Sequence, residues 1–361
     1  MKKIGLLTLP LTSNYGGILQ CIALYEFLKQ EGYEPILLKN NFIYPKWKLA
    51  VIKTLEYLPF QNFKNFRLNR IKSKIFKDLK NKIFTNTTVE LKNRSDYIEK
   101  LKTLKLDALV VGSDQVWRYE YIKDLYPERY FLDFCSEGTR KIAYSASFGI
   151  DVWEGPAQFT RNVQNSIKSF FAISTRESSG LKICSNLFEY RSAHHTLDPT
   201  LLIESSFFYN LADHNCEKPP TEIVSYILDP NEEKSNIIET TLKQKKYRSH
   251  LELNNSKNPV KIECWLSKIK NANFVITDSY HGMLFSIIFK KDFLVIGNKN
   301  RGMSRFLSIL EKLEIKNRLV NSNEAINEIN IEPLDYEIIY KKLYNLKTDS
   351  KNYLIKSIES K

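Results

Sequence analysis

The chain of 361 residues is 43% hydrophobic and 26% charged, with a formal net charge of +13, and this is the composition of a globular protein long enough for two domains with buried cores. Its longest apolar stretches, such as Phe285–Phe289, are far shorter than the roughly 20 residues that a membrane-spanning helix needs. The N-terminus has neither a long apolar stretch nor a small-residue cleavage site, so we expect no secretory signal.

The first 40 residues predict a strand, a helix and a second strand. Ile4–Leu9 is a short apolar stretch, and Ile18–Gln30 has apolar residues at helical spacing before Gly32 ends the pattern. Pro35–Leu38 is the second predicted strand. This is the pattern of a βαβ unit, whose loop at the carboxyl end of the first strand carries glycines.

Residues 41–106 interrupt this rhythm and predict two or three basic helices, inserted in or draped over the first domain. They contain 16 lysines and arginines against five acidic residues, a net charge of +11 that accounts for most of the excess in the chain. Such a segment suits an anionic membrane surface or a phosphate-bearing partner, while nucleic acid and a solvated pair of lysine-rich helices are the alternatives. Its aromatic residues include Trp47, Tyr57, Phe60, Phe63, Phe66, Phe76 and Phe84.

Strands and helices then alternate to about residue 320, which indicates mostly parallel sheets. Two such sets predict an α/β protein of two Rossmann-like domains facing a cleft. We expect an N-terminal domain at 1–150, a C-terminal domain at 151–330, and a helical tail at 331–361 that packs back on the first domain. The predicted strands are Asp107–Val111, Ile142–Ser147, Phe170–Ser174, Glu222–Leu228, Phe274–Thr277 and Phe293–Ile296.

Two polar loops of the first domain follow strand ends, where parallel sheets bind their ligands. The loop Asn14-Tyr15-Gly16-Gly17 with Gln20 lacks both the G-x-G-x-x-G pattern and a P-loop lysine, so a dinucleotide site is poorly supported, and a tight turn that needs glycine is the structural alternative. The second loop suits a sugar, because Ser113, Asp114 and Gln115 supply hydrogen-bonding groups and Trp117 a ring face. For Trp117, a place in the core is the alternative.

The strongest candidate of the second domain is Asp278-Ser279-Tyr280-His281-Gly282, between a strand and a helix. Amides at a helix N-terminus favour a phosphate or carboxylate, Gly282 lets the backbone approach a ligand, and His281 can donate a proton near pH 7. A capping aspartate and a buried structural histidine are the alternative.

Three arginines follow strands of the same region. Arg176 can clamp a carboxylate or phosphate or form an internal ion pair, and Arg301 and Arg305 follow the strand Phe293–Ile296. Asp198, which precedes a proline, is most simply a turn or cap residue.

The sequence shows no metal site. His194 and His195 are adjacent, and adjacent histidines rarely converge on one ion. The five cysteines are widely spaced and none lies in a Cys-x-x-Cys pair, so we expect neither a zinc site nor a disulfide framework. This cysteine usage fits a protein of the reducing cytoplasm. These cysteines are Cys21, Cys135, Cys184, Cys216 and Cys264.

Taken together, these motifs resemble the polysaccharide pyruvyl transferases of bacterial capsule and exopolysaccharide pathways. The resemblance is collinear over residues 1–320, although residues 41–106 and the tail match poorly. The matching stretches are 14–24, 110–117, 143–149, 174–177, 197–202, 277–282, 291–293 and 304–305.

The resemblance implies a glycosyltransferase-B-like arrangement of the two domains, and the chemistry that it implies needs neither a cofactor nor a metal. It implies phosphoenolpyruvate as donor, a sugar with two free hydroxyls as acceptor, and a cyclic pyruvate ketal and phosphate as products. His281, Asp278 and Arg176 are then catalytic, with His281 as the general acid that protonates the donor methylene or assists the departure of phosphate. The donor site is Ser279, Tyr280, Gly282, Arg301 and Arg305, and the acceptor site is Asn14, Tyr15, Gly16, Gly17, Gln20, Ser113, Asp114, Gln115 and Trp117.

This chain departs from the family pattern at one position. Better-known members have an arginine two residues before the motif histidine that helps to hold the donor, and here that residue is Ser279. We therefore expect Arg176, Arg301 or Arg305 to supply the cation.

The expected acceptor is a capsule repeat unit linked to undecaprenyl diphosphate at the inner face of the plasma membrane. The protein would then be cytoplasmic, touch the anionic membrane through residues 41–106, and bind no nucleic acid. The alternatives are a nucleotide-sugar-dependent glycosyltransferase of the same fold and a non-catalytic protein that binds an anionic surface or nucleic acid.

Overall fold

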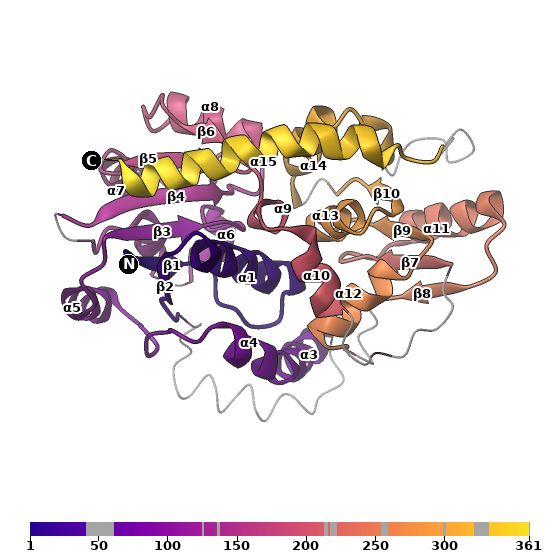
Figure 1. The fold of residues 1–361 in the computed structure, drawn as a ribbon, viewed down its shortest axis with the longest axis horizontal. Coiled ribbons are helices and arrows are strands. Elements are labelled where there is room, and N and C mark those ends of the chain that lie inside the picture. The colour runs from indigo at the N-terminus through magenta and orange to yellow at the C-terminus, as the bar shows by residue number, and fades with distance from the viewer. Residues whose placement is uncertain are drawn as a thin grey trace. The chain divides into compact units, whose positions relative to one another are not determined.

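The computed structural model describes residues 1–40, 61–124, 126–135, 138–212, 216, 222–253, 259–298, 301–320 and 332–360, and for residues 61–67 the backbone alone. The chain forms two compact units (Figure 1). The first comprises Met1–Ile203 and Leu346–Lys361, and the second comprises Glu204–Asn345.

The first unit is built on a six-stranded sheet with the order β2-β1-β3-β4-β5-β6, in which every pairing is parallel. β5 and β6 extend this sheet rather than starting a new one, so the unit ends at Ile203 and not near residue 150. The strands are β1 (Lys3–Leu7), β2 (Glu34–Leu37), β3 (Ala108–Gly112), β4 (Arg140–Ala146), β5 (Ala172–Thr175) and β6 (His194–His195).

Helices connect these strands and cover the sheet. Helix α1 (Tyr15–Gln30) is buried over nearly its whole length, because it is apolar on most sides, and the Asn14 side chain caps it by accepting from the Gly17 amide at 3.3 Å. The other helices are α3 (Gln61–Ile75), α4 (Lys77–Ile83), α5 (Arg94–Leu104), α6 (Tyr119–Ile122), the 3₁₀ helix η1 (Pro127–Phe131), α7 (Ala157–Ile167), α8 (Ser178–Asn186) and α9 (Pro199–Leu202).

The second unit contains a smaller, five-stranded sheet with the order β11-β10-β9-β7-β8, again entirely parallel. The two parallel sheets confirm the predicted α/β class. The strands are β7 (Ile223–Tyr226), β8 (His250–Glu252), β9 (Phe274–Thr277), β10 (Asp292–Ile296) and β11 (Leu319–Val320), and the helices are α10 (Ser205–Ala212), α11 (Glu232–Lys245), α12 (Ile262–Lys270), α13 (Tyr280–Ile288), α14 (Ser304–Lys312) and the 3₁₀ helix η3 (Lys316–Arg318).

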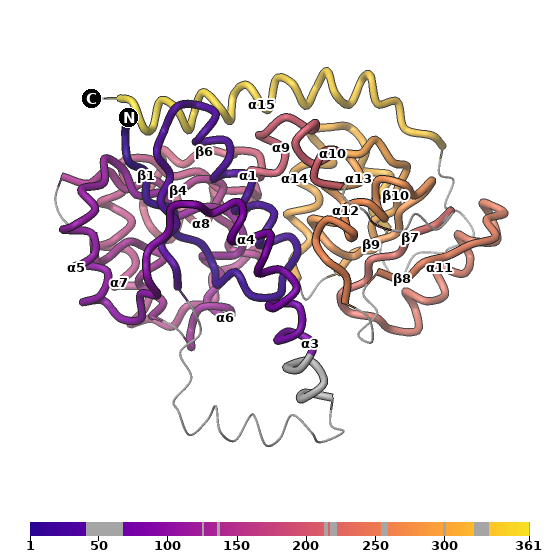
Figure 2. The backbone as a smooth tube through the Cα atoms, turned by 60° about the horizontal axis from the view of Figure 1, so that its bottom comes forward, coloured from indigo at the N-terminus to yellow at the C-terminus, as the bar shows by residue number. Residues whose placement is uncertain are grey.

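Helix α15 (Tyr336–Glu359) divides between the units at Leu346. Its end belongs to the first unit, where Arg140 Nη1 donates to the Ile358 carbonyl at 2.6 Å and Lys2 Nζ lies 2.6 Å from the Glu359 carboxylate. The two chain termini therefore lie side by side (Figure 2). Among the described residues no helix, the 24-residue α15 included, is both long and apolar enough to cross a membrane.

The described part of the basic segment folds as helices α3, α4 and α5, which agrees with the predicted helical insertion. Two of its aromatic residues belong to the core, since the Phe76 ring lies 4.8 Å from that of Tyr15 and the Phe84 ring 5.2 Å from that of Tyr25, and both tyrosines belong to α1. Burial thus removes Phe76 and Phe84 from the aromatic surface that we expected to face a membrane. Trp47, Tyr57 and Phe60 lie outside the described residues, and Phe63 and Phe66 are described by their backbone alone.

The prediction that the chain has no disulfide is wrong. Cys216 and Cys264 are joined, with Cα atoms 5.4 Å apart and a sequence separation of 48. Their wide spacing gave no signal of this pairing, because the fold brings the two residues together. Cys21, Cys135 and Cys184 are free thiols.

Candidate active site

The first turn of α13 presents His281 at the carboxyl end of β9. Ser279 caps this helix by accepting from the Gly282 amide at 3.3 Å, while its own amide donates to Thr277 Oγ1 at 3.0 Å. The His281 ring is buried, with its centroid 5.5 Å from that of Tyr280. A capped N-terminus points its remaining amides outward, so this turn joins a titratable ring to an anion-favouring helix end.

Gly282 allows α13 to approach β9 closely. A Cβ atom on Gly282 would lie 2.4 Å from Thr277 Oγ1, which in turn donates to the Tyr226 carbonyl at 2.6 Å. The first unit repeats the arrangement, because a Cβ on Gly180 of α8 would lie 2.8 Å from Thr175 at the end of β5. Glycine is therefore required here by packing, and it fixes the position of His281.

Replacing Gly282 by alanine is expected to destabilise the protein by about 1–3 kcal/mol, the usual range for overpacking, and to lower turnover by moving His281. Chemical denaturation measures the first effect. Adding Thr277→Ala removes the clashing Oγ1, so the two substitutions together should cost less than the sum of their separate effects. Strict additivity would contradict this account of the contact.

Two arginines lie near this turn. The Arg305 guanidinium lies 5.7 Å from the centre of the Tyr280 ring and donates to the Arg301 carbonyl. Arg301 holds Asp229 with two hydrogen bonds of 2.5 and 2.8 Å, and these, more than any other contact, keep the pKa of Asp229 below its usual value. Among the described residues no three His, Cys, Asp or Glu side chains gather as metal ligands do.

Asp278 is committed to the protein interior. It accepts hydrogen bonds from the Leu228 amide at 2.6 Å, the Asp229 amide at 3.1 Å and Lys234 Nζ at 2.7 Å. Asn298 Nδ2 lies 3.4 Å from the same carboxylate. Asp278 therefore joins the ends of β7 and β9 and positions the loop that carries His281.

Lys234, Asn298 and Asp229 were not recognised from the sequence as part of this network. Asp229 and Asn298 each come two or three residues after a strand, β7 and β10, and polar residues directly after parallel strands are the signal that could have found them. Lys234 lies inside α11, and nothing in its local pattern indicates that Asp278 is its partner.

Arg176 lies in the first unit and forms an internal ion pair. Its Nη1 donates to Asp198 Oδ2 at 2.9 Å and its Nη2 is 3.9 Å from Asp114, with both members of the 2.9 Å pair fully buried. Asp198 also accepts from Ser113 Oγ at 3.0 Å. The structure thus supports the ion-pair interpretation of Arg176, in which it positions the loop after β3.

A cavity of about 250 Å³ lies beside the N-terminal loop. Asn14, Gly17 and Asp114, three of the predicted acceptor residues, line it together with residues 9–12, Ile18 and Tyr121. Ser113 and Asp114 have φ angles of 28° and 63°, and non-glycine residues in this conformation carry strain of a kind that clusters at functional sites.

The other predicted acceptor residues are buried and are not among the described residues that line this cavity. Tyr15 and Gly16 are buried in α1, and Gln20 Nε2 donates to the Gly17 carbonyl at 2.8 Å. Gln115 accepts from Arg118 Nη1 at 3.2 Å. These residues shape the loop from within.

Trp117 does not present the ring face that we expected for a sugar. Its side chain is fully buried, stacks on Phe131 with centroids 5.4 Å apart, and donates from Nε1 to the Tyr130 carbonyl at 2.9 Å. The indole N–H thus has a hydrogen-bond acceptor, Phe131 covers the ring face, and Trp117 belongs to the core of the first unit.

Two α/β units with parallel sheets, each bearing polar loops at its strand ends, define a glycosyltransferase-B-like fold. The putative UDP-N-acetylglucosamine 2-epimerase from Listeria monocytogenes superposes with a TM-score of 0.54 at 10% identity, over 98% of this chain and 90% of that chain. The UDP-GlcNAc 2-epimerase from Neisseria meningitidis, bound to UDP-GlcNAc, gives 0.47 at 9% identity, over 99% and 94%. At such identities the likeness concerns the fold alone.

The family is defined by sequence. The profile of the polysaccharide pyruvyl transferases matches residues 14–300, most of the chain and every motif described above up to Gly282. The protein belongs to this family and is a transferase. No curated protein matches it significantly.

Proposed function

We propose that the protein transfers the pyruvyl group of phosphoenolpyruvate to two hydroxyls of one sugar in a polysaccharide repeat unit, giving a cyclic ketal and phosphate. The placement of His281 supports this most directly. The ring lies in the capped first turn of α13, with Arg305 against the neighbouring Tyr280. This arrangement offers one proton donor and several anion-binding groups, which is what a donor with a carboxylate and a phosphate requires.

The chemistry proceeds by two additions at one carbon. A proton from His281 goes to the donor methylene, which becomes a methyl group, and the adjacent carbon becomes oxocarbenium-like. The first sugar hydroxyl forms a C–O bond to that carbon and returns a proton to His281. The C–O bond to phosphate then breaks, the second hydroxyl forms the other C–O bond to the same carbon, and its proton leaves with the phosphate. In this scheme Asp278 positions the loop and does not touch the donor.

Arg305→Gln is expected to raise KM for phosphoenolpyruvate about 10- to 100-fold with a smaller change in kcat, since a hydrogen bond to a charged group contributes about 1.5–3 kcal/mol. Initial rates of phosphate release measure both constants. Lys312→Gln, on an exposed position near the other end of α14, is the matched control and should leave both unchanged. An unchanged KM in Arg305→Gln would remove this residue from the donor site.

We assign the acceptor to the cavity beside Asn14 and Asp114. The acceptor is then a glycan linked to undecaprenyl diphosphate, the protein acts at the inner face of the plasma membrane, and residues 41–106 contact anionic lipid. Basic residues near such a surface contribute about 1 kcal/mol each. Flotation with anionic vesicles at low salt tests this contact, and absence of binding would exclude it.

The decisive experiment is phosphate release from phosphoenolpyruvate with a panel of short galactose-, glucose- and mannose-containing glycans, free and lipid-linked. Acceptor-dependent release, with the product gaining the mass of a pyruvyl ketal, is the expected result. Binding of a nucleotide sugar without any binding of phosphoenolpyruvate would instead support a glycosyltransferase of the same fold.

A further inference from the structure

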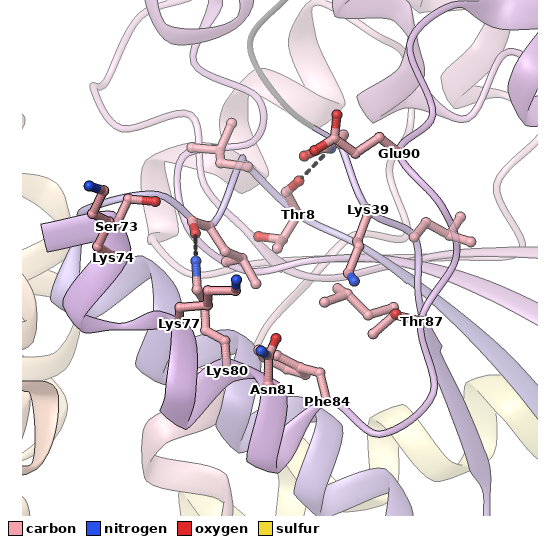
Figure 3. Close-up of a pocket in the computed structure, with 15 residues that line it drawn as sticks. Thr8, Lys39, Ser73, Lys74, Lys77, Lys80, Asn81, Phe84, Thr87 and Glu90 are labelled. Atoms are coloured by element: carbon pink, nitrogen blue, oxygen red, sulfur yellow. Dashed lines mark hydrogen bonds between the residues drawn. The ribbon is translucent and has the colours of Figure 1, made fainter. Parts of the chain in front are cut away.

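A lysine-lined cavity of about 380 Å³ lies in the first unit at the carboxyl ends of β1 and β2 (Figure 3). Thr8 and Leu9 follow β1, Lys39 and Asn40 follow shortly after β2, and α4 with the end of α3 forms the opposite wall. This edge of a parallel sheet is where such folds bind ligands. None of the sequence stretches that carry the family resemblance includes the lysines of this cavity.

Positive charge dominates the lining. Lys39, Lys74, Lys77 and Lys80 face one carboxylate, Glu90, and within the described part of the chain none of these four lysines forms an ion pair. Figure 3 shows the ammonium groups of Lys77 and Lys80 on one side of the cavity and that of Lys39 on the other. Like charges held around one space repel each other unless an anion enters.

Lys80 is partly withdrawn from water, whereas Lys39, Lys74 and Lys77 are exposed. Its Nζ donates to the Leu11 carbonyl at 2.7 Å. Burial lowers the pKa of Lys80, and the charge of Lys39 lowers it further. The negative charge of an anion bound between the two lysines would raise this pKa again.

The cavity is also partly apolar and large enough for more than a lone phosphate. Leu9, Leu11, Leu38 and Phe84 line it beside the lysines, and its volume lies within the range of small-molecule sites. A phosphate ester, which joins charged oxygens to an organic group, matches such a lining better than a free inorganic ion does.

Position connects this cavity to the acceptor. Leu9 and Leu11 line both the lysine cavity and the cavity of Asn14 and Asp114, so the two spaces adjoin at one loop. A sugar in one and a phosphate ester in the other can belong to a single ligand.

We propose that the lysine cavity binds the phosphate or diphosphate through which the acceptor glycan is attached to its carrier. This rests on the proposed function for the identity of the glycan. The recognition itself depends only on Lys39, Lys77 and Lys80 as ligands of phosphate oxygens.

The test uses farnesyl diphosphate as the probe, below its micelle concentration, in calorimetric titrations with the full-length protein. Lys39→Gln/Lys77→Gln removes two cavity charges and should weaken binding at least tenfold. Lys82→Gln/Lys92→Gln removes two exposed charges outside the cavity and should change binding less than twofold. Farnesol, which lacks the diphosphate, should not bind.

Several outcomes overturn the proposal. These are no binding to the wild-type protein, equal weakening in both double variants, and equal binding of farnesol. Cavity-dependent binding to phosphatidylglycerol vesicles but not to the soluble diphosphate would assign the lysines to membrane headgroups instead.

Activity separates this proposal from the proposed function. If the protein binds the diphosphate through the cavity lysines but transfers no pyruvyl group, the phosphate site stands and the proposed function fails. The opposite outcome is equally efficient transfer to diphosphate-linked and diphosphate-free glycans, by the wild type and by the cavity variant alike. The proposed function then stands and the cavity has no part in acceptor binding.

Discussion

His281→Ala is expected to lower kcat for pyruvyl transfer by about 10²–10⁴-fold, the usual contribution of a general acid. Protonation of the donor methylene creates the electrophilic carbon, so neither C–O bond to the sugar can form before this proton is transferred. Loss of the ring removes the proton donor but leaves the capping bonds of Ser279 and the contact between Gly282 and Thr277 intact. The donor should therefore still bind, and KM for phosphoenolpyruvate should change less than kcat.

Phosphate release at saturating donor measures this loss, and thermal unfolding verifies that the variant is folded. His250→Gln is the matched control, because His250 lies in the same unit and bonds Ser225 at 2.8 Å. It should retain full activity. A folded His281→Ala protein with a kcat within threefold of the wild type would contradict the role of His281 as the acid.

The parallel fold could be predicted because its strands are buried and therefore continuously apolar. Phe274–Thr277 was predicted with the bounds that β9 has in the structure. The unit boundary could not be predicted in the same way. β6 is two histidines long, and such a short polar strand has no apolar pattern, although its pairing with β5 keeps residues up to Ile203 in the first unit.

The position of the candidate site followed from the strand ends, but the roles of its charged residues did not. The bond between Arg176 and Asp198 spans 22 residues and that between Lys234 and Asp278 spans 44, so only the folded chain shows that these charges are paired. Trp117 is likewise buried because Phe131 of η1 stacks on its ring. Local sequence indicates which residues can do chemistry, and packing decides which of them a ligand can reach.

A five-residue spacing between threonine and glycine in the sequence could have located two strand-to-helix turns. Thr175 and Gly180 are five residues apart, as are Thr277 and Gly282, and in both places the threonine ends a strand while the glycine lies in the following helix. The close approach of helix to strand needs a residue without a side chain at that point. The shared spacing identifies two equivalent strand-to-helix turns, of which the second carries His281.

Asp198→Ala is expected to destabilise the protein by about 3–5 kcal/mol, because it leaves Arg176 as a buried charge without its principal carboxylate. Both side chains are fully buried and joined at 2.9 Å, and the same carboxylate holds Ser113 at 3.0 Å. Chemical denaturation followed by tryptophan fluorescence measures the loss, since Trp117 lies in the core of this unit. Glu120→Ala, which breaks an exposed ion pair with Lys123, should leave the transition unchanged.

The double variant Arg176→Met/Asp198→Leu distinguishes a structural from a donor-binding role of Arg176. Replacing a whole buried pair by apolar residues is often neutral or stabilising, so part of the lost stability should return, although the bonds of the Asp198 carboxylate to Ser113 and Thr200 stay lost. If Arg176 only positions the loop of Ser113 and Asp114, KM for phosphoenolpyruvate should also stay near its wild-type value. A stable double variant with a strongly raised KM would instead place Arg176 in the donor site, and the internal pair would then be the resting state of a residue that changes partners when the donor binds.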